Sequence, residues 1–262
     1  GNREPPAFAA HLVYNTQYSE HFTLPPPTLP PRSIRRMNIL PPLKVLYEDN
    51  HCLVIDKPAR VLSMGDETGE PTVLEQAKSY LKEKYRKPGE VYLGVVHRLD
   101  RPTSGVLLFA RTSKAAGRLS DQFRRHLIRK TYLAQVEGIP RPPAGTLVCH
   151  LSKNRENNLV SVVPESVPGA QRAELSYSTL ESVNGQSLLE IKPKTGRSHQ
   201  IRVQLADLGT PIVGDCKYGA KKSLDGVILL HASSLEFEHP TRKDWIRVEA
   251  PLPEQFGLAS TR

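Results

Sequence analysis

The sequence contains only three cysteines among 262 residues, and they lie far apart at positions 52, 149 and 216. An odd number of isolated cysteines suggests neither a disulfide framework nor a Cys-x-x-Cys metal site. The chain also lacks an apolar run of the ~20 residues that a membrane-spanning helix needs, and it lacks a secretory signal. These absences predict reduced thiols and a soluble protein of the cytoplasm.

The usual cofactor motifs are missing as well. There is no Walker motif, no glycine pattern of a dinucleotide-binding fold and no zinc-ligand spacing. His199, His231 and His239 are too spread out to suggest a ligand set. The sequence therefore contains no motif that indicates a metal or cofactor site.

Charge of one sign is in excess. The chain has 36 lysines and arginines against 27 acidic residues, a formal charge of +9. This balance favours a polyanionic partner such as nucleic acid. Charge alone does not identify that partner, because many basic proteins bind no nucleic acid.

Prolines separate the start of the chain from the rest. Residues 24–42 contain clustered prolines, which resist both helix and sheet and favour an extended strap. The regular hydrophobic pattern begins after them. We predict a proline-rich extension over residues 1–42, one domain over residues 43–255 and a tail over residues 256–262, and we expect a monomer.

Hydrophobic periodicity predicts both strands and helices. Strands are expected at residues 43–49, 51–58, 105–111, 130–138, 173–181, 187–193, 226–240 and 244–253. Helices are expected at residues 70–85, 113–127 and 198–209, the first with a capping box of Thr72 and Glu75. The polar residues 152–172 suit a mobile loop. This mixture predicts an α+β fold, with a mostly antiparallel, mixed sheet, flanking helices and a cleft across the sheet.

The segment HRLDRPTSGVLLFAR, residues 97–111, places Asp100 where an apolar stretch gives way to a turn. Taken alone, such an aspartate bonds backbone donors of its own turn. However, the segment closely resembles the His-Arg-Leu-Asp-x-x-Thr-Ser-Gly motif of the RluA-like pseudouridine synthases. Segments at 45–62, 130–138, 194–219 and 229–240 resemble other parts of that family in the same order, so the resemblance covers about residues 43–253. Gln204 and Thr210 stand where the family usually has histidine.

The resemblance implies that residues 43–255 form a catalytic domain that isomerises uridine to pseudouridine in structured RNA, ribosomal or transfer. The base is detached, turned and rejoined through carbon 5, which requires no cofactor. Asp100 is implied as the catalytic carboxylate and Arg197 as the arginine that pairs with it. Whether Asp100 attacks as a nucleophile or removes a ribose proton stays open. Tyr132 is implied to stack on uracil and to serve proton transfer at carbon 5.

The same resemblance suggests how RNA is held. Leu230 either forms an apolar floor beneath the base or is an ordinary leucine of the core. A uridine in folded RNA has to be extruded, and Arg98 is placed to fill the gap or hold a phosphate. The cations expected at the RNA are Arg98, Arg101, Arg124, Arg125 and Arg202. We expect His97 to make a structural hydrogen bond, and Thr103 and Ser104 to bond the backbone of the turn.

Two other functions remain to be weighed. A catalytically silent RNA-binding module could keep the same fold, although the joint presence of Asp100, Tyr132 and Arg197 speaks against it. An aspartate-dependent hydrolase would need a second catalytic acid. The motif supplies none clearly.

Overall fold

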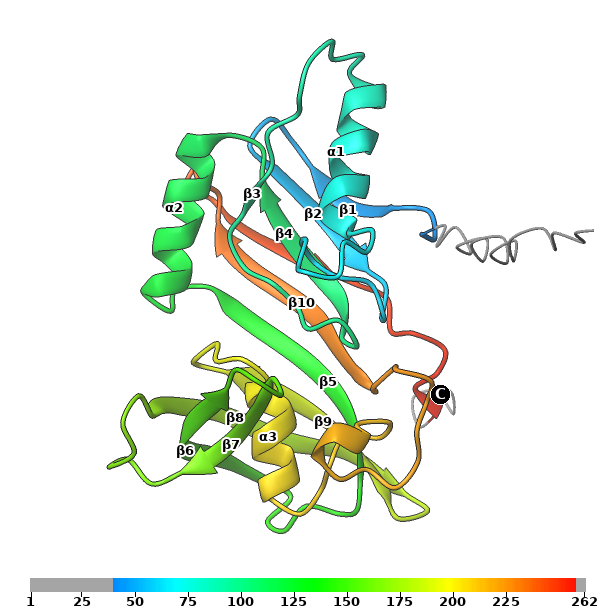
Figure 1. The fold of residues 1–262 in the computed structure, drawn as a ribbon, viewed down its shortest axis with the longest axis vertical. Coiled ribbons are helices and arrows are strands. Elements are labelled where there is room, and N and C mark those ends of the chain that lie inside the picture. Colours follow the sequence, from blue (N-terminus) through cyan, green and yellow to red (C-terminus); the bar gives the residue numbers. More distant parts are fainter. Residues whose placement is uncertain (1–39, 258–262) are drawn as a thin grey trace, which may run out of the picture. The chain divides into compact units, whose positions relative to one another are not determined.

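A computed structural model describes residues 40–257 of the chain, and its ribbon is shown in Figure 1. The proline-rich extension predicted over residues 1–42 therefore lies almost entirely outside the described residues. The strands are β1 (Lys44–Glu48), β2 (Cys52–Lys57), β3 (Gly94–Val95), β4 (Ser104–Ala110), β5 (Arg129–Glu137), β6 (Ala144–Asn154), β7 (Leu159–Val163), β8 (Gln171–Val183), β9 (Gln186–Pro193), β10 (Leu230–Glu238) and β11 (Trp245–Glu249). The helices are α1 (Val73–Lys84), α2 (Ser113–Arg124), α3 (Gln200–Asp207) and the short η1 (Cys216–Tyr218).

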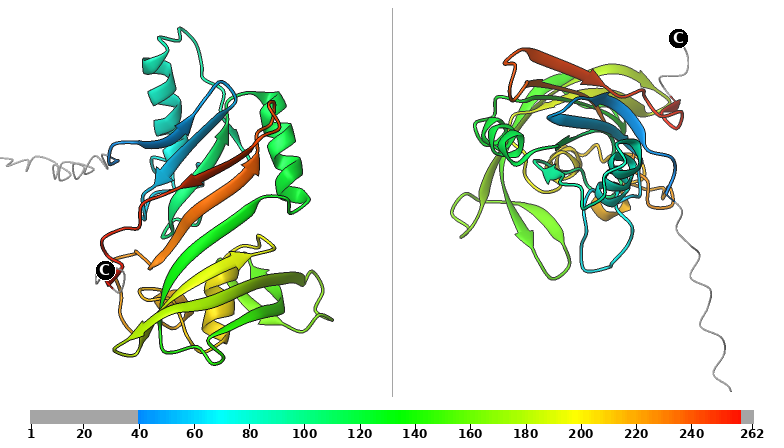
Figure 2. Two further views of the ribbon diagram at one scale, coloured as in Figure 1. Left: turned by 180° about the vertical axis from the view of Figure 1, so that it is seen from behind. Right: turned by 90° about the horizontal axis from the view of Figure 1, so that it is seen from above.

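The strands form one mixed sheet. Its order is β1-β2-β4-β10-β5-β9-β8-β6-β7, with β3 also paired to β4 and β11 also paired to β10. Only the contact of β4 with β10 is parallel among the strand pairs of residues 40–257. Figure 2 shows the sheet from behind, where β10 and β11 (orange to red) run beside each other. The predicted α+β fold with a mostly antiparallel, mixed sheet is confirmed.

Apolar side chains of β4 point alternately into two core clusters, as a strand buried on both faces requires. Val106 and Leu108 belong to the cluster that also contains α2, whereas Leu107 and Phe109 belong to the cluster that contains α1. Each helix thus covers one face of the same strand. The capping box predicted at the start of α1 is present, because the Thr72 hydroxyl accepts the N–H of Glu75 at 3.2 Å. A third cluster packs α3 against β5, β8 and β9.

One predicted loop is wrong. Residues 152–172 contain the end of β6, all of β7 and the start of β8. β6 forms antiparallel pairs with both β7 and β8. The segment looks like a loop in sequence because many of its side chains are solvent-exposed, and backbone hydrogen bonds hold the hairpin. None of the helices in residues 40–257 is long and apolar enough to cross a membrane.

At the start of β4, the backbone lies very close to the backbone of β10. Gly105 has a φ of +109° and lies opposite Ala232 in the parallel pairing of β4 with β10. A Cβ at this position would overlap the Ala232 carbonyl oxygen and would lie 2.7 Å from its nitrogen. Only glycine fits this conformation and this space. The glycine that ends the quoted motif is therefore needed to join the two strands.

We expect Gly105→Ala to lower the free energy of unfolding by at least about 3 kcal/mol, because the added methyl group meets rigid backbone at a strained φ. Gly117→Ala is the matched control. Gly117 lies inside α2 with open space around its Cα, so alanine there should raise the stability by about 1 kcal/mol. Urea unfolding followed by circular dichroism measures both. Similar effects of the two substitutions would contradict this account of the strand contact.

Candidate active site

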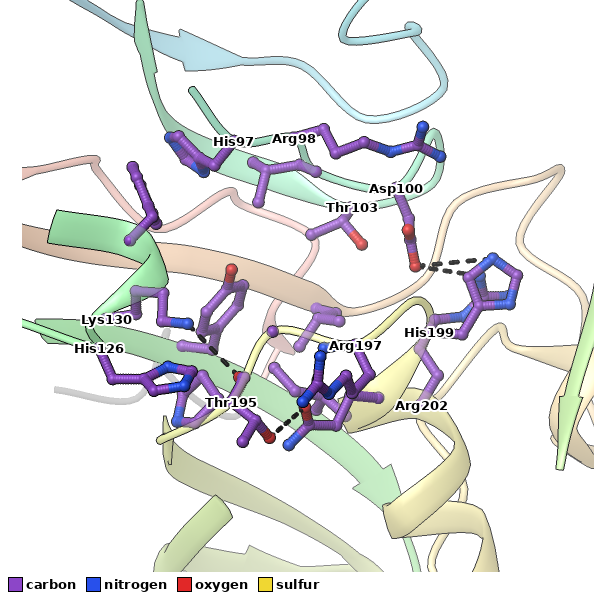
Figure 3. Close-up of a pocket in the computed structure, with 18 of the residues that line it drawn as sticks. His97, Arg98, Asp100, Thr103, His126, Lys130, Thr195, Arg197, His199 and Arg202 are labelled. Atoms are coloured by element: carbon purple, nitrogen blue, oxygen red, sulfur yellow. Dashed lines mark hydrogen bonds and ion pairs between the residues drawn. The ribbon is translucent and has the colours of Figure 1, made fainter. Parts of the chain in front are cut away.

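Asp100 lies on the wall of a cavity of about 550 Å³. The cavity is lined by residues of the turn before β4, of α2, of β5 and of α3 with the turn before it, shown in Figure 3. The Asp100 side chain is half-buried, and the N–H of Thr103 donates to the Asp100 carbonyl oxygen at 3.0 Å, which closes the turn. Segments far apart in the sequence therefore meet around one carboxylate.

A buried lysine supports the loop that carries Asp100. The Lys57 ammonium donates to the carbonyl oxygens of Pro58 at 2.8 Å, Val61 at 2.7 Å and Arg101 at 3.3 Å. Burial lowers the pKa of Lys57 to about 7, and the charge of Asp100 partly opposes this shift. The three bonds tie the end of β2 to the residue that follows Asp100.

The cation that faces Asp100 is Arg202, and this corrects the expected pairing with Arg197. Arg202 Nη1 lies 3.4 Å from Asp100 Oδ2, and Arg202 is buried. The Nε of Arg197 donates instead to the carbonyl oxygen of Arg172 at 3.1 Å. Arg197 precedes the first residue of α3 and is exposed, whereas Arg202 lies within the helix on a side that faces the cavity. Both arginines line the cavity.

Arg202 is itself held by a second carboxylate. Its Nε and Nη2 donate to the two oxygens of Asp215 at 2.7 and 2.8 Å, and its guanidinium carbon lies 4.9 Å from the centre of the Tyr218 ring. Burial opposes the charge on Arg202, but Asp215 and then Asp100 outweigh it and raise the pKa of the guanidinium. Arg202 therefore stays charged and fixed in orientation.

His199 is the second side chain near Asp100, with Nε2 at 3.9 Å from Oδ2. Its backbone is left-handed, with a φ of +52°, and its Nδ1 lies 2.7 Å from the Tyr218 hydroxyl. Burial lowers the pKa of His199, although the charge of Asp100 partly offsets this. His199 thus favours the neutral form, and Arg202 carries the positive charge opposite Asp100.

Asp215 and Tyr218 are functional residues that were not predicted from the sequence. Both lie in the segment PIVGDCKYG, in which an acidic residue follows an apolar stretch and a glycine. Asp215 is 2% exposed, and a buried aspartate requires a partner. An isolated acidic residue in an apolar segment was therefore the sequence signal that could have indicated a buried ion pair.

Tyr132 and Leu230 belong to the apolar part of the lining. They come from the neighbouring strands β5 and β10, and Leu230 is buried. Burial, and secondarily the charge of Asp100, raises the pKa of the Tyr132 phenol. The phenol therefore keeps its proton at neutral pH. These positions agree with the expected surroundings of a base.

The expected RNA-binding cations are distributed unevenly. Arg98 and Arg124 line the cavity, whereas Arg101 and Arg125 are outside its lining and pair with Glu70 at 2.6 Å and Asp121 at 3.5 Å. Lys130 also lines the cavity, and burial lowers its pKa to about 8. Arg124 pairs with Asp121 as well, so Arg98 is the exposed cation of the expected set that lines the cavity and forms no ion pair within residues 40–257.

Two polar side chains near the motif have structural partners. His97 Nε2 accepts the N–H of Leu108 at 2.9 Å, and burial lowers the pKa of His97 to about 3, so the expected structural role is confirmed. The Ser104 hydroxyl bonds Nδ1 of His231 at 2.9 Å rather than the backbone of the turn. The expectation for Ser104 was wrong because its strand pairs with β10, which brings His231 alongside.

One group of potential metal ligands occurs in residues 40–257, formed by Asp49, Cys52 and His239. Asp49 Oδ1 already accepts the N–H of Cys52 at 2.8 Å. Its Oδ2 lies 2.7 Å from His239 Nε2 and accepts from Arg242 Nη1 at 3.2 Å. A guanidinium at the carboxylate repels a second cation. The group fits a hydrogen-bond cluster better than a metal site.

Comparison with known proteins identifies the family of this chain. The sequence profile of the RNA pseudouridylate synthase family matches residues 51–207, more than half of the chain. The chain belongs to this family. Among curated relatives, an uncharacterized RNA pseudouridine synthase YhcT of Bacillus subtilis is 36% identical over 80% of this chain and 69% of its own. Ribosomal large subunit pseudouridine synthase D of Xanthomonas campestris is 36% identical over 82% and 67%.

Solved structures agree with this assignment. The human RNA pseudouridylate synthase domain containing 4 has a TM-score of 0.68 and 26% identity, over 81% of this chain and 90% of that one. The human domain containing 1 has a TM-score of 0.63 and 27% identity, over 80% and 83%. The fold of this pseudouridine synthase is therefore that of other members of the family.

The two positions that depart from the RluA-like pattern lie away from the cavity lining. Gln204 Nε2 donates to the Leu147 carbonyl oxygen at 3.2 Å, and the Thr210 hydroxyl donates to the Leu205 carbonyl oxygen at 3.4 Å. Both side chains are buried. Their hydrogen bonds connect α3 to its surroundings. The two differences from the family pattern therefore affect how the helix is held in place.

We expect Asp215→Asn to lower the free energy of unfolding by about 3 kcal/mol or more, because it leaves the buried Arg202 charge with a weaker partner. Glu236→Gln is the control, since Glu236 makes exposed ion pairs with Arg129 and Arg247 at 3.3 and 2.9 Å and should cost less than about 1 kcal/mol. Chemical denaturation measures both. An Asp215→Asn protein as stable as the control would show that the buried pair is not required.

Proposed function

We propose that this pseudouridine synthase isomerises uridine in ribosomal RNA, with Asp100 as the catalytic carboxylate. The observation that carries the proposal is the ion pair of Asp100 with Arg202, inside a cavity that Tyr132 and Leu230 line. Two relatives that are named ribosomal large subunit pseudouridine synthases support the choice of ribosomal RNA as the substrate. The chain spans about two thirds of their length.

The pairing suits the chemistry at the ribose. A half-buried carboxylate loses hydration, which favours its protonated form, and an opposing guanidinium stabilises the ionised form. Arg202 supplies that charge, and Asp215 holds it in place. Asp100 is then ready to act as a nucleophile at the ribose or as a base, and both routes remain compatible with this arrangement.

The detached uracil has to be kept from water until it is rejoined through carbon 5. We infer that the Tyr132 ring stacks on the base and that Leu230 closes the cavity beneath it. Because the Tyr132 phenol is protonated at neutral pH, it is a donor near the base and not a ready proton acceptor. If this hydroxyl removes the proton at carbon 5, another group has to accept the proton that the phenol already carries.

The residues that line the cavity also argue against the two alternative functions, a hydrolase and a catalytically silent RNA-binding module. Asp100 is the only acidic residue among the described residues that line it. A hydrolase that uses a pair of carboxylates would require a second one that faces the cavity. Asp215 lies on the far side of the Arg202 guanidinium, where it is buried and outside the cavity lining. A silent RNA-binding module would need neither the buried Arg202–Asp215 pair nor its orientation toward Asp100. Both rivals are therefore less well supported than the isomerase.

Extrusion of the target uridine costs a few kcal/mol, which contacts in the cavity have to offset. Arg98 is exposed on the cavity wall beside the motif, and we infer that it occupies the gap left in the RNA or binds a flanking phosphate. Arg124 and Lys130 also line the cavity. The reaction involves neither redox change nor net hydrolysis, so we propose no cofactor.

Release of tritium from RNA that carries 5-tritiated uridine tests the proposal, because rejoining through carbon 5 expels that hydrogen. We expect release with the wild-type protein and a fall of at least about a thousandfold with Asp100→Asn, which lacks the negative charge. Asp66→Asn, an exposed aspartate outside the cavity, should retain full activity. Ribosomal and transfer RNA are compared as substrates. Equal activity of the Asp100→Asn protein would refute the assigned carboxylate, and activity on transfer RNA alone would refute the ribosomal target.

Binding to RNA should depend on cations that have no acidic partner. Lys153 and Arg155 line a second cavity of about 350 Å³ together with Arg197, and within residues 40–257 none of the three forms an ion pair. Each phosphate contact contributes about 0.7–0.9 to the slope of log affinity against log salt. We expect Lys153→Ala/Arg155→Ala to reduce that slope by one to two.

The control is Lys243→Ala/Arg247→Ala, since Lys243 pairs with Glu238 at 2.8 Å and Arg247 pairs with Glu236 at 2.9 Å. Dissociation constants from filter binding between 50 and 200 mM salt give the slopes. If the two double variants reduce the slope equally, the second cavity is not a phosphate contact.

A further inference from the structure

Thr103 carries a buried hydroxyl that the fold leaves without a partner. The residue is 2% exposed, and its Oγ1 makes no hydrogen bond to any described residue. Thr103 lines the same cavity as Asp100, and Figure 3 shows the two side chains next to each other. The expectation that this hydroxyl bonds the backbone of the turn was wrong.

The turn does not need this hydroxyl. Its closing bond comes from the backbone N–H of Thr103, which donates to the Asp100 carbonyl oxygen at 3.0 Å. The neighbouring Ser104 hydroxyl bonds His231 and is structural. A buried hydroxyl without a partner costs about 1–3 kcal/mol, and a valine of the same shape would avoid that cost. The polar atom at position 103 therefore serves something other than the stability of the turn.

The chemistry of the neighbours indicates which group it meets. An ionised carboxylate only accepts hydrogen bonds, whereas a hydroxyl both donates and accepts. A hydroxyl between Asp100 and Thr103 donates to the first and accepts from the second. A uracil carbonyl oxygen only accepts, so it cannot satisfy both. Uracil could satisfy the pair only with two atoms, its N3–H and a neighbouring carbonyl oxygen, whereas Asp100 is proposed to act at the ribose. The ribose 2′-hydroxyl satisfies the pair with one group, and it is the group that distinguishes RNA from DNA.

We propose that Thr103 Oγ1 donates a hydrogen bond to the ribose 2′-hydroxyl of the target uridine and so positions the sugar against Asp100. Together the two residues then recognise the target nucleotide as a ribonucleotide. This inference rests on the proposed isomerase function of the same cavity.

The test compares Thr103→Val, which keeps the shape and removes the hydroxyl, with Thr103→Ser, which keeps the hydroxyl. We expect Thr103→Val to lower kcat/KM by about 10- to 100-fold and to leave Tm equal to or above that of the wild type. Thr103→Ser should stay within about threefold of the wild type in kcat/KM. A structural hydroxyl would give the opposite pattern, with a lower Tm for Thr103→Val.

A second measurement identifies the contacted group. Dissociation constants are measured for an RNA with uridine at the target and for the same RNA with a single 2′-deoxyuridine there. We expect Thr103→Val to weaken binding of the first RNA about tenfold and to have no effect on the second, because the partner hydroxyl is already absent.

The outcomes are distinct. Wild-type kcat/KM in the Thr103→Val protein, a lowered Tm, or an equal loss of affinity for both RNAs would overturn the inference while leaving the isomerase function intact. If the wild-type protein forms no pseudouridine in any RNA, the proposed function itself fails.

Discussion

The site depends on one guanidinium held between two carboxylates. Arg202 uses two of its N–H groups for Asp215 and presents another to Asp100. The bidentate bond fixes the plane of the guanidinium, and the Tyr218 ring packs on its face. Because Asp215 is almost completely buried, its cost of burial is offset only while Arg202 stays in place. The orientation of the cation toward Asp100 is therefore built into the packing of α3.

Local features of the fold were predictable from sequence. The capping box at Thr72 and the period of the strands follow from short-range patterns, and the structure shows them. The third helix was expected from residue 198, and α3 begins two residues later at Gln200. The turn at Asp100 could also be predicted from the sequence, because a buried strand, a proline and a glycine mark it. What the sequence could not show is why Gly105 is required, since the clash that excludes a side chain comes from Ala232, more than a hundred residues away.

Long-range relations explain the errors at the site. Arg197 and Arg202 are five residues apart, and the choice between them depends on where α3 begins and which way it faces. His199 adopts a left-handed backbone between them, which redirects the chain just before the helix. Residues 152–172 were misread because the β6–β7 hairpin is held by backbone pairing and presents mostly polar side chains. In both cases tertiary contacts decided what local composition left open.

The place of β10 in the sheet has a consequence for synthesis of the protein on the ribosome. β10 lies between β4 and β5, and so it joins the strand that follows the Asp100 turn to the strand that carries Tyr132. Until residues 230–238 have emerged, β4 and β5 have no common neighbour, and the two halves of the sheet lack their main junction. Pairing over such sequence distances is slow compared with helix formation. A nascent chain that has already exposed its aspartate motif therefore remains unable to assemble the cleft, and activity appears only late in translation.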